Sequence, residues 1–261
     1  RAKTQNEELA CKGIFIYLAY DGTNYHGWQI QPNGISVQEC LMKALSTFLR
    51  RKIEVIGAGR TDAGVHASLM VAHFDFDEPL DEISVADKIK PFVTSRYFHL
   101  SCLPGPAGCA CPFLMRLANL QVLCNDIEIS FLTGNIVGEF IIKLDYALMN
   151  EAARTPFSST LTLELQQTSY GCKDQYLHIT HAEWTQEDDA TWVFTIRADR
   201  FLRNMVRAIV GTLIEVGRGE TYYRRLPAGF IEQQDRCKAG TSAPGQALFL
   251  VNVEYPESIF E

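Results

Sequence analysis

Alternating apolar and polar positions predict several strands and one amphipathic helix in the first third of the chain. Residues 13–20 alternate well enough for a first strand, and the stretches 53–56 and 69–76 predict two more around a glycine-rich loop. Ser36, with Glu39 three residues later, forms a capping box that predicts where a helix begins. That helix gathers its apolar residues on one face: Val37, Leu41, Ala44, Leu45, Phe48 and Leu49.

The last third of the chain has equally regular patterns. Residues 177–184 and 191–197 predict a pair of strands around an acidic turn, and 247–255 predict a closing strand. Asp199 is a suitable N-cap for a helix that Gly217 would end. This helix would carry an apolar stripe made of Phe201, Leu202, Met205, Ile209, Leu213 and Val216. On a separate face it would present a row of arginines, Arg200, Arg203 and Arg207. Such a row suggests that a binding partner lies close to this face.

Strands and helices in this order predict an α+β fold. The length of 261 residues allows one large domain or two modest ones, and no internal repeat is evident. A short amphipathic helix is expected over 77–89. Further on the patterns become weak, because Pro and Gly break the periodicity and only Arg116 is charged between residues 102 and 125.

The composition is typical of a soluble globular protein, with 47% hydrophobic and 21% charged residues. No apolar run approaches the roughly 20 residues that a membrane-spanning helix needs. Residues 1–12 lack the apolar centre of a signal peptide, so we expect a cytoplasmic protein without membrane contact. The eight cysteines are scattered, with neither a Cys-x-x-Cys pair nor the spacing of a zinc site. We therefore expect no metal and no disulfide.

The distribution of charge matters more than its sum for a nucleic-acid partner. A net charge of −7 argues mildly against such a partner. The basic residues nevertheless gather in two clusters, at 50–52 and in a second group that consists of Arg197, Arg200, Arg203 and Arg207. The acidic surplus lies elsewhere, so an RNA-binding surface is compatible with the sequence.

The glycine-rich loop at residues 57–67 is the strongest candidate for a functional site. Glycines at this spacing let the backbone approach a ligand closely, and the loop carries the charged pair Arg60 and Asp62. From composition alone, a tight turn with a solvated ion pair would explain the loop equally well.

Three sequence motifs decide between these readings. Gly-Arg-Thr-Asp-Ala-Gly-Val-His-Ala at 59–67 resembles, without a mismatch, the signature of the TruA-type tRNA pseudouridine synthases. Tyr-Asp-Gly-Thr-x-Tyr-x-Gly-Trp-Gln at 20–29 resembles the first motif of that family. Phe-x-x-x-Met-Val-Arg-x-Ile-Val-Gly at 201–211 resembles another. The chain is identified as a member of that family on these residues.

The resemblance implies a role for each candidate residue. Asp62 corresponds to the catalytic aspartate, and Arg207 to the arginine that pairs with it. Arg60 is placed to contact phosphate or to fill the base stack that a flipped uridine leaves. Arg203 is expected to bind RNA beside Arg207. Leu120 occupies the position of the tyrosine that stacks on the target base.

This last position departs from the family pattern. An alignment through Phe113 places Ala118 and Leu120 where the family has arginine and tyrosine, and leucine offers neither a π-face nor a hydroxyl. The motifs find no match from about 91 to 176. Two explanations stay open: true divergence, or an error in the recorded sequence, such as a shifted reading frame, between two well-matched ends.

The resemblance also implies an architecture and a reaction. Two related ferredoxin-like α+β halves, 13–105 and 106–256, would join their mostly antiparallel sheets side by side, with the active-site cleft between them. The enzyme would convert uridine to pseudouridine at positions 38, 39 or 40 of the tRNA anticodon stem-loop. It would need no cofactor and no metal, and would act as a homodimer.

Two other functions compete with this one. A catalytically impaired relative that only binds tRNA would explain the missing tyrosine. A hydrolase that uses Asp62 with His66 or His73 belongs to another class, but the sequence lacks a nucleophile motif and metal ligands.

Overall fold

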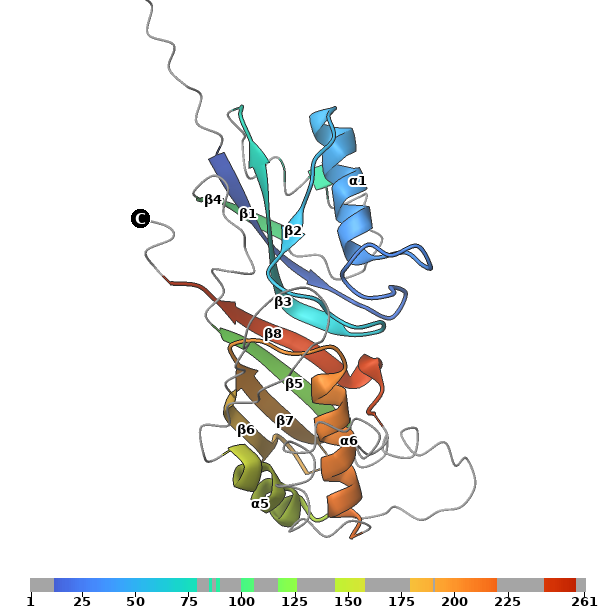
Figure 1. The fold of residues 1–261 in the computed structure, drawn as a ribbon, viewed down its shortest axis with the longest axis vertical. Helices are drawn as coiled ribbons and strands as arrows, with labels where there is room; N and C mark the ends of the chain where they lie inside the picture. Colours follow the sequence, from blue (N-terminus) through green and yellow to red (C-terminus); the bar gives the residue numbers. More distant parts are fainter. Residues whose placement is uncertain are drawn as a thin grey trace, which may run out of the picture.

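One mixed sheet forms the frame of the structure, a computed structural model that describes residues 12–78, 85, 88–89, 100–105, 117–125, 144–157, 179–189, 191–219 and 242–256. Within these residues its strands run in the order β4-β1-β3-β8-β5-β7-β6, and a short β2 pairs with β3 (Figure 1). The strands are β1 (Lys12–Tyr20), β2 (Ile56–Gly57), β3 (His66–Phe76), β4 (Leu100–Gly105), β5 (Leu117–Asn125), β6 (Ile179–Gln186), β7 (Thr191–Ala198) and β8 (Leu248–Glu254).

The sheet has a seam at β3 and β8, where the two parts of the chain meet. These strands are parallel and pair at His66↔Phe249 and Ala67↔Leu250. Every other strand pair of the described sheet is antiparallel. β1 to β4 lie on one side of the seam and β5 to β8 on the other. The mixed, largely antiparallel layout agrees with the expected α+β class, while the relation of the two halves as ferredoxin-like units and their boundary stay predictions.

Three α-helices, α1, α5 and α6, and the short 3-10 helix η4 (Gly245–Ala247) have their bounds within the described residues. Helix α1 (Val37–Leu49) begins as the capping box predicts, since the Ser36 hydroxyl accepts a hydrogen bond from the Glu39 amide at 3.2 Å. It accompanies the strands before the seam, whereas α5 (Tyr146–Phe157) and α6 (Met205–Gly217) lie over β5, β7 and β6 (Figure 1). None of the helices among the described residues is both long and apolar enough to cross a membrane.

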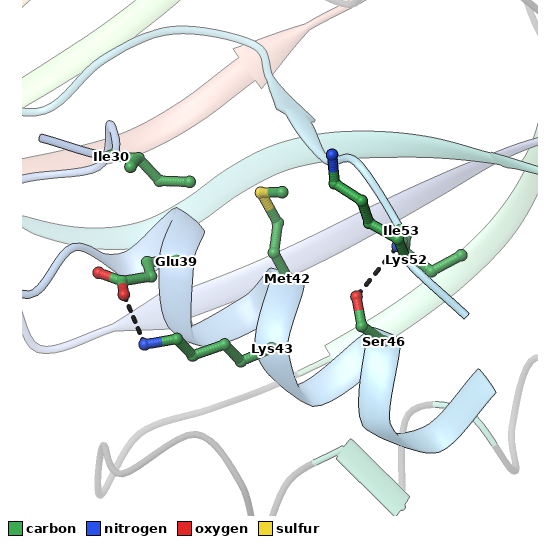
Figure 2. A pocket seen from close by; sticks show the side chains of 7 residues that line it. All are labelled: Ile30, Glu39, Met42, Lys43, Ser46, Lys52 and Ile53. Carbon is green, nitrogen blue, oxygen red and sulfur yellow. Dashed lines mark hydrogen bonds and ion pairs between the residues drawn. The ribbon is translucent and has the colours of Figure 1, made fainter. Parts of the chain in front are cut away.

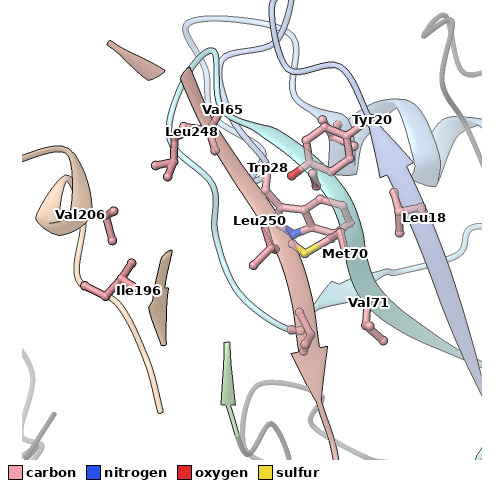
Figure 3. Packing of buried hydrophobic residues seen from close by; sticks show 14 of the residues in the cluster. Leu18, Tyr20, Trp28, Val65, Met70, Val71, Ile196, Val206, Leu248 and Leu250 are labelled. Atoms are coloured by element: carbon pink, nitrogen blue, oxygen red, sulfur yellow. The ribbon is translucent and has the colours of Figure 1, made fainter. Parts of the chain in front are cut away.

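The hydrophobic core continues across the seam. Figure 3 shows Leu18 of β1 and Met70 of β3 on one side, and Ile196 of β7 and Val206 of α6 on the other, with Leu250 of β8 between them. All of these side chains are buried. Burying a side chain of this size contributes about 1.5–3 kcal/mol, so the shared core holds the two sides of the sheet firmly against each other. The start of β3 therefore rests on a rigid support.

Two elements differ from their sequence predictions. No strand forms over 53–55: Ile53 and Val55 are buried and their neighbours exposed, as in a strand, but ladder pairing begins only at Ile56. The segment is instead held by side chains, because the Ser46 hydroxyl accepts from the Ile53 amide at 3.0 Å. Alternation of buried and exposed residues thus indicates an extended backbone that packs on one face, whether or not a partner strand is present.

The last helix begins later than predicted. Asp199 is not its N-cap, because Asn204 adopts a left-handed conformation (φ 60°) and the helical residues start at Met205. Arg200 and Arg203 consequently precede the helix and do not form a row with Arg207. The end at Gly217 is confirmed, although the left-handed glycine that follows is Gly219, whose amide donates to the Val216 carbonyl at 2.9 Å.

Most of the remaining predicted elements agree with the structure. The strand pair after residue 177, the closing strand and the first strand are confirmed within a few residues. Of the short helix expected over 77–89, Val85, Lys88 and Ile89 are helical, whereas Asp77 and Glu78 form a bend, and the other residues lie outside the described part of the chain.

Candidate active site

The motif loop that connects β2 to β3 is held in place by the segment that follows β1. The Trp28 amide donates to the Thr61 carbonyl at 3.1 Å, and the Gly64 amide donates to the Tyr25 carbonyl at 3.2 Å. Gly27 and Gly64 have φ of +89° and +77°, values that residues with a Cβ rarely adopt. The two motifs thus form one hydrogen-bonded unit, which the sequence alone could only place near each other.

Tyr20 anchors the motif loop through a hydrogen bond to Thr61. Its hydroxyl lies 2.8 Å from the Thr61 hydroxyl, and its ring is buried at 2% exposure beside Trp28. Burial raises the pKa of Tyr20 strongly, and the hydrogen bond to Thr61 offsets only part of that rise. Tyr20 therefore stays a neutral phenol at any working pH, which makes it a structural anchor rather than a base.

His66 fastens the end of the loop to both sides of the seam. Its Nε2 lies 3.0 Å from the Gln246 carbonyl oxygen, and its ring stacks on Phe249 with centroids 4.7 Å apart. Its Nδ1 lies 3.1 Å from the Asp21 carboxylate and 3.2 Å from the Gly22 amide, so the ring tautomer decides whether it donates to the carboxylate or accepts from the amide. The pKa of Asp21 is lowered, first by hydrogen bonds from Thr23 and to a smaller extent by His66. His66 thus has a structural use on each ring nitrogen.

Asp62 is half-buried and faces the second part of the chain. Its Oδ2 accepts a hydrogen bond from the backbone amide of Asn204 at 3.0 Å. Asn204 is the residue before the first turn of α6, so the carboxylate lies at the N-terminus of that helix. A negative charge is favoured there by the helix dipole, typically by about 0.3–1 kcal/mol. The structure thus brings the loop aspartate to the N-terminus of α6.

Arg207 lies in the first turn of α6 but does not pair with Asp62 in this structure. Its Nε donates to the Ala243 carbonyl at 2.6 Å, and the Ala243 amide donates back to the Arg207 carbonyl at 2.9 Å. Among the ion pairs of the described residues there is none between Arg207 and Asp62. The expected partners therefore flank one site without touching.

The segment before β8 closes the site from a third direction. A Cβ on Gly245 would lie 2.4 Å from the Ala63 carbonyl oxygen, so this segment approaches the motif loop more closely than any residue with a side chain could. The Ser242 hydroxyl accepts from the Asn204 amide group Nδ2 at 2.8 Å. Four segments distant in sequence consequently meet around Asp62.

The other predicted site residues are placed unevenly. Arg60 is exposed on the motif loop, and no hydrogen bond or ion pair within the described residues holds its side chain. Arg203 is exposed just before α6. Leu120 belongs to β5, with backbone partners Ile196 and Leu250, but its side chain lies outside the described part of the structure.

The geometry gives no support to a hydrolase that uses Asp62 with a histidine. His73 is buried at 2% exposure, seven positions along β3 from His66, a separation of about 23 Å at strand rise. Burial lowers the pKa of His73, so it is a neutral core residue. His66 is engaged on both ring nitrogens. No group of three or more His, Cys, Asp or Glu side chains in the described ranges could hold a metal ion.

A shallow pocket lies elsewhere, beside α1 (Figure 2). It has a volume of about 250 Å³, below the usual range for ligand sites of about 300–1,000 Å³. Its two lysines already have partners, since Lys43 pairs with Glu39 and Lys52 with Glu54. None of the predicted site residues lines this pocket: its walls consist of Ile30, Glu39, Met42, Lys43, Ser46, Lys52 and Ile53.

Comparison with known proteins assigns the family. Residues 162–256 match the model of a tRNA pseudouridine synthase family. The chain is 57% identical over 254 residues to the tRNA pseudouridine synthase A of Bacteroides thetaiotaomicron, covering 94% of this chain and 91% of that protein. The chain is 56% identical over 260 residues to the tRNA pseudouridine synthase A of Bacteroides fragilis, covering 97% of this chain and 100% of that protein. It is 34% identical over 255 residues to the tRNA pseudouridine synthase A of Geobacter sulfurreducens, covering 93% of this chain and 99% of that protein.

The chain belongs to the tRNA pseudouridine synthase A family. Membership makes it a pseudouridine synthase, an isomerase. The similarity reaches further along the chain than the three motifs indicate. The family match begins at residue 162, ahead of the pattern at 177, and the relatives' matches span so much of the chain that they run across 91–176.

Sequence reasoning missed two residues that shape the site of this family member. Asn204 was only an unassigned position inside the third motif, and Ser242 only part of a loop. Asn204 did carry a signal, because asparagine is a residue type that tolerates a left-handed turn, although it lies inside the helical stripe that the sequence predicts from Phe201. Ser242 carried none, because only the fold brings it to Asn204.

Proposed function

We propose that this chain isomerises uridine to pseudouridine in the anticodon stem-loop of tRNA, at positions 38, 39 or 40, with Asp62 as the catalytic residue. The single observation that carries the proposal is the setting of Asp62. Its carboxylate is partly accessible, fixed by a backbone amide, and surrounded by four segments, of which three carry family motifs.

The reaction asks for what these residues supply. The bond from N1 of uracil to C1′ of ribose breaks, the base turns, and C5 bonds to C1′ instead. The hydrogen on C5 leaves and N1 gains one, so there is no net oxidation and no energy source is needed. A carboxylate beside the nucleoside can either attack it or accept the proton, and Asp62 at the N-terminus of α6 would supply that carboxylate.

Arg207 would complete this arrangement once tRNA is bound. Only its Nε has a hydrogen bond within the described residues, so its two Nη groups are available for Asp62 or for a phosphate. Arginine suits both partners because its guanidinium forms two parallel hydrogen bonds with either.

The arginines outside the centre would hold the RNA. A uridine within a stem must leave the base stack before it can react, and the loop that carries Asp62 also carries the exposed Arg60. Arg60 would contact phosphate or fill the vacated stack, and Arg203 would contact the backbone nearby. Leu120, at the position of the family tyrosine, would line the base pocket without stacking as an aromatic ring does.

The remaining expectations belong to the same proposal. The two halves, 13–105 and 106–256, would enclose the nucleoside in a cleft along the seam. A homodimer in the cytoplasm would let one subunit help to position tRNA on the other.

Site mapping tests the proposal. Unmodified tRNA transcripts, with a uridine kept at only one of the three positions, would be incubated with the protein, and pseudouridine would be located by carbodiimide adducts that stop reverse transcription. We expect stops only at the retained uridine. Stops outside the anticodon stem-loop would contradict the proposed specificity while leaving the family assignment intact.

A tRNA-binding relative without activity is the second candidate, because Leu120 stands where the family has tyrosine. The same experiment separates the two functions. Retention of tRNA on a filter at nanomolar to micromolar protein, with no reverse-transcription stop at any position, would favour binding alone.

A further inference from the structure

Asn204 has a backbone conformation that calls for an explanation. Its φ of 60° and ψ of 7° place it in the left-handed region, and Arg50 at the end of α1 is the only other non-glycine residue with positive φ in the described ranges. A usual N-cap residue is extended and caps the helix with its side chain. Asn204 forms no such cap. A strained conformation of this kind persists only where surrounding contacts enforce it.

Every polar group of Asn204 that has a described contact serves a different part of the site. Its amide donates to Oδ2 of Asp62 at 3.0 Å. Its carbonyl accepts from the Ala208 amide at 3.1 Å, which is the first hydrogen bond of α6. Its side-chain Nδ2 donates to the Ser242 hydroxyl at 2.8 Å. The residue therefore connects the motif loop, the helix and the segment before β8.

The conformation explains the first contact. An amide that belongs to the first turn of a helix points along the helix axis, whereas the left-handed turn at Asn204 directs its N–H across the seam toward Asp62. Asparagine is one of the few residues with a Cβ that adopt this region at low cost. The bond from Nδ2 to Ser242 then holds the turn in place.

We propose that Asn204 is a positioning residue, whose left-handed backbone aims its amide at Asp62 and thereby fixes the rotamer in which that carboxylate faces the nucleoside. The proposal rests on the catalytic role proposed for Asp62. Asn204 itself touches no reacting atom, so its loss affects the chemical step and leaves tRNA binding unchanged.

Four variants test this proposal on unmodified tRNA: Asn204→Ala, Asn204→Gly, Ser242→Ala and Asp62→Asn. Steady-state kcat and KM, filter-binding Kd for tRNA and the thermal unfolding midpoint are measured for each. Alanine loses both the Ser242 bond and the tolerance for positive φ, so we expect kcat to fall about tenfold, with KM and Kd within about twofold. Glycine adopts the left-handed region freely, so we expect its kcat to stay within about threefold of wild type.

The comparison of kcat between Asn204→Ala and Asn204→Gly decides whether the backbone conformation or the side chain of Asn204 matters. A role that depends on the side chain alone would lower kcat equally in both variants, and that result would overturn the proposal. Wild-type kcat in Asn204→Ala would overturn it as well. Ser242→Ala, which keeps Asn204, is expected to lower kcat less than Asn204→Ala does, and it tests the anchor even if Asn204→Ala folds poorly.

The Asp62→Asn variant separates the two proposals. If it retains turnover, the catalytic role of Asp62 fails and the positioning role fails with it. If it is inactive while Asn204→Ala turns over like wild type, only the positioning role fails.

Discussion

Arg207 and Ala243 exchange two hydrogen bonds: Nε of Arg207 donates to the Ala243 carbonyl at 2.6 Å, and the Ala243 amide donates to the Arg207 carbonyl at 2.9 Å. This pair joins the first turns of α6 to the segment that enters β8. The side chain that the family motif would place on Asp62 is thus engaged first with its own half of the protein. Its two Nη groups remain available for the role that we propose for Arg207 once tRNA is bound.

Replacing Arg207 tests that role. Arg207→Leu removes the bond to Ala243 and the cation together, and we expect kcat to fall by about a hundredfold or more, as for the loss of a group that holds transition-state charge. Arg207→Lys keeps the charge without the planar fork, so we expect an intermediate loss. Arg154→Leu, which removes an exposed arginine of α5 paired with Glu183, is the matched control and should turn over like wild type. Near-wild-type turnover of Arg207→Leu would exclude the proposed role.

The exposed Arg60 should reveal itself in the salt dependence of tRNA binding. If it contacts one phosphate, Arg60→Ala lowers the slope of log K against log salt by about 0.7–0.9. Arg60→Lys should then restore most of that slope, because lysine also binds phosphate as a point charge. Filter binding between 50 and 300 mM salt measures this, with Arg154→Ala as control. An unchanged slope together with a lower kcat would point instead to Arg60 as the residue that fills the vacated stack.

The Tyr20–Thr61 hydrogen bond should contribute to the stability of the folded protein. Tyr20→Phe leaves the buried ring in place and removes only the hydroxyl, so we expect a loss of about 1 kcal/mol in the free energy of unfolding. A double-mutant cycle with Thr61→Val, read by urea unfolding, isolates the pair from other effects of each change. A coupling energy near zero would show that the hydroxyl contact does not hold the motif loop.

Sequence reasoning located the motif loop because its motif is specific and its flanking strands have clear periods. The same reasoning placed Arg200, Arg203 and Arg207 in one helical row, which the structure contradicts. A single left-handed residue, Asn204, shifts the helix start, and hydrophobic periodicity carries no information about one φ angle.

Contacts across the seam could not be predicted for a related reason. The bonds from Asn204 to Asp62 and from Asn204 to Ser242 join residues far apart in the chain. They depend on how β3 and β8 pair, and this pairing is fixed by a core built from both sides. The class of the fold followed from element order, whereas the site required the tertiary structure.

The buried His73 predicts a pH dependence of stability. Burial lowers the pKa of His73 in the folded state from its ordinary value of 6.5, and the nearby Asp75 offsets part of this effect. The unfolded chain therefore takes up a proton that the folded chain does not, so this residue favours unfolding as the pH falls through 6.5. No hydrogen-bond partner satisfies its buried Nδ1 among the described residues.

His73→Phe should remove that effect. We expect the variant to lie within about 1.5 kcal/mol of wild type at pH 8, because the ring volume is nearly conserved. As the pH falls from 7 to 5, wild type should lose stability relative to the variant in urea titrations. Parallel pH curves for the two proteins would show that His73 does not titrate with folding.

The most direct measurement is tritium release from unmodified tRNA labelled at C5 of uridine, with wild type beside Asp62→Asn. The replacement is nearly isosteric and removes only the charge, and the Asn204 amide can still donate to the amide oxygen that replaces Oδ2. We expect wild type to release tritium with turnover and the variant to release none above background, while both bind tRNA with similar Kd. Equal release by the two proteins would contradict the catalytic role of Asp62, and no release by wild type would contradict the proposed activity of the chain.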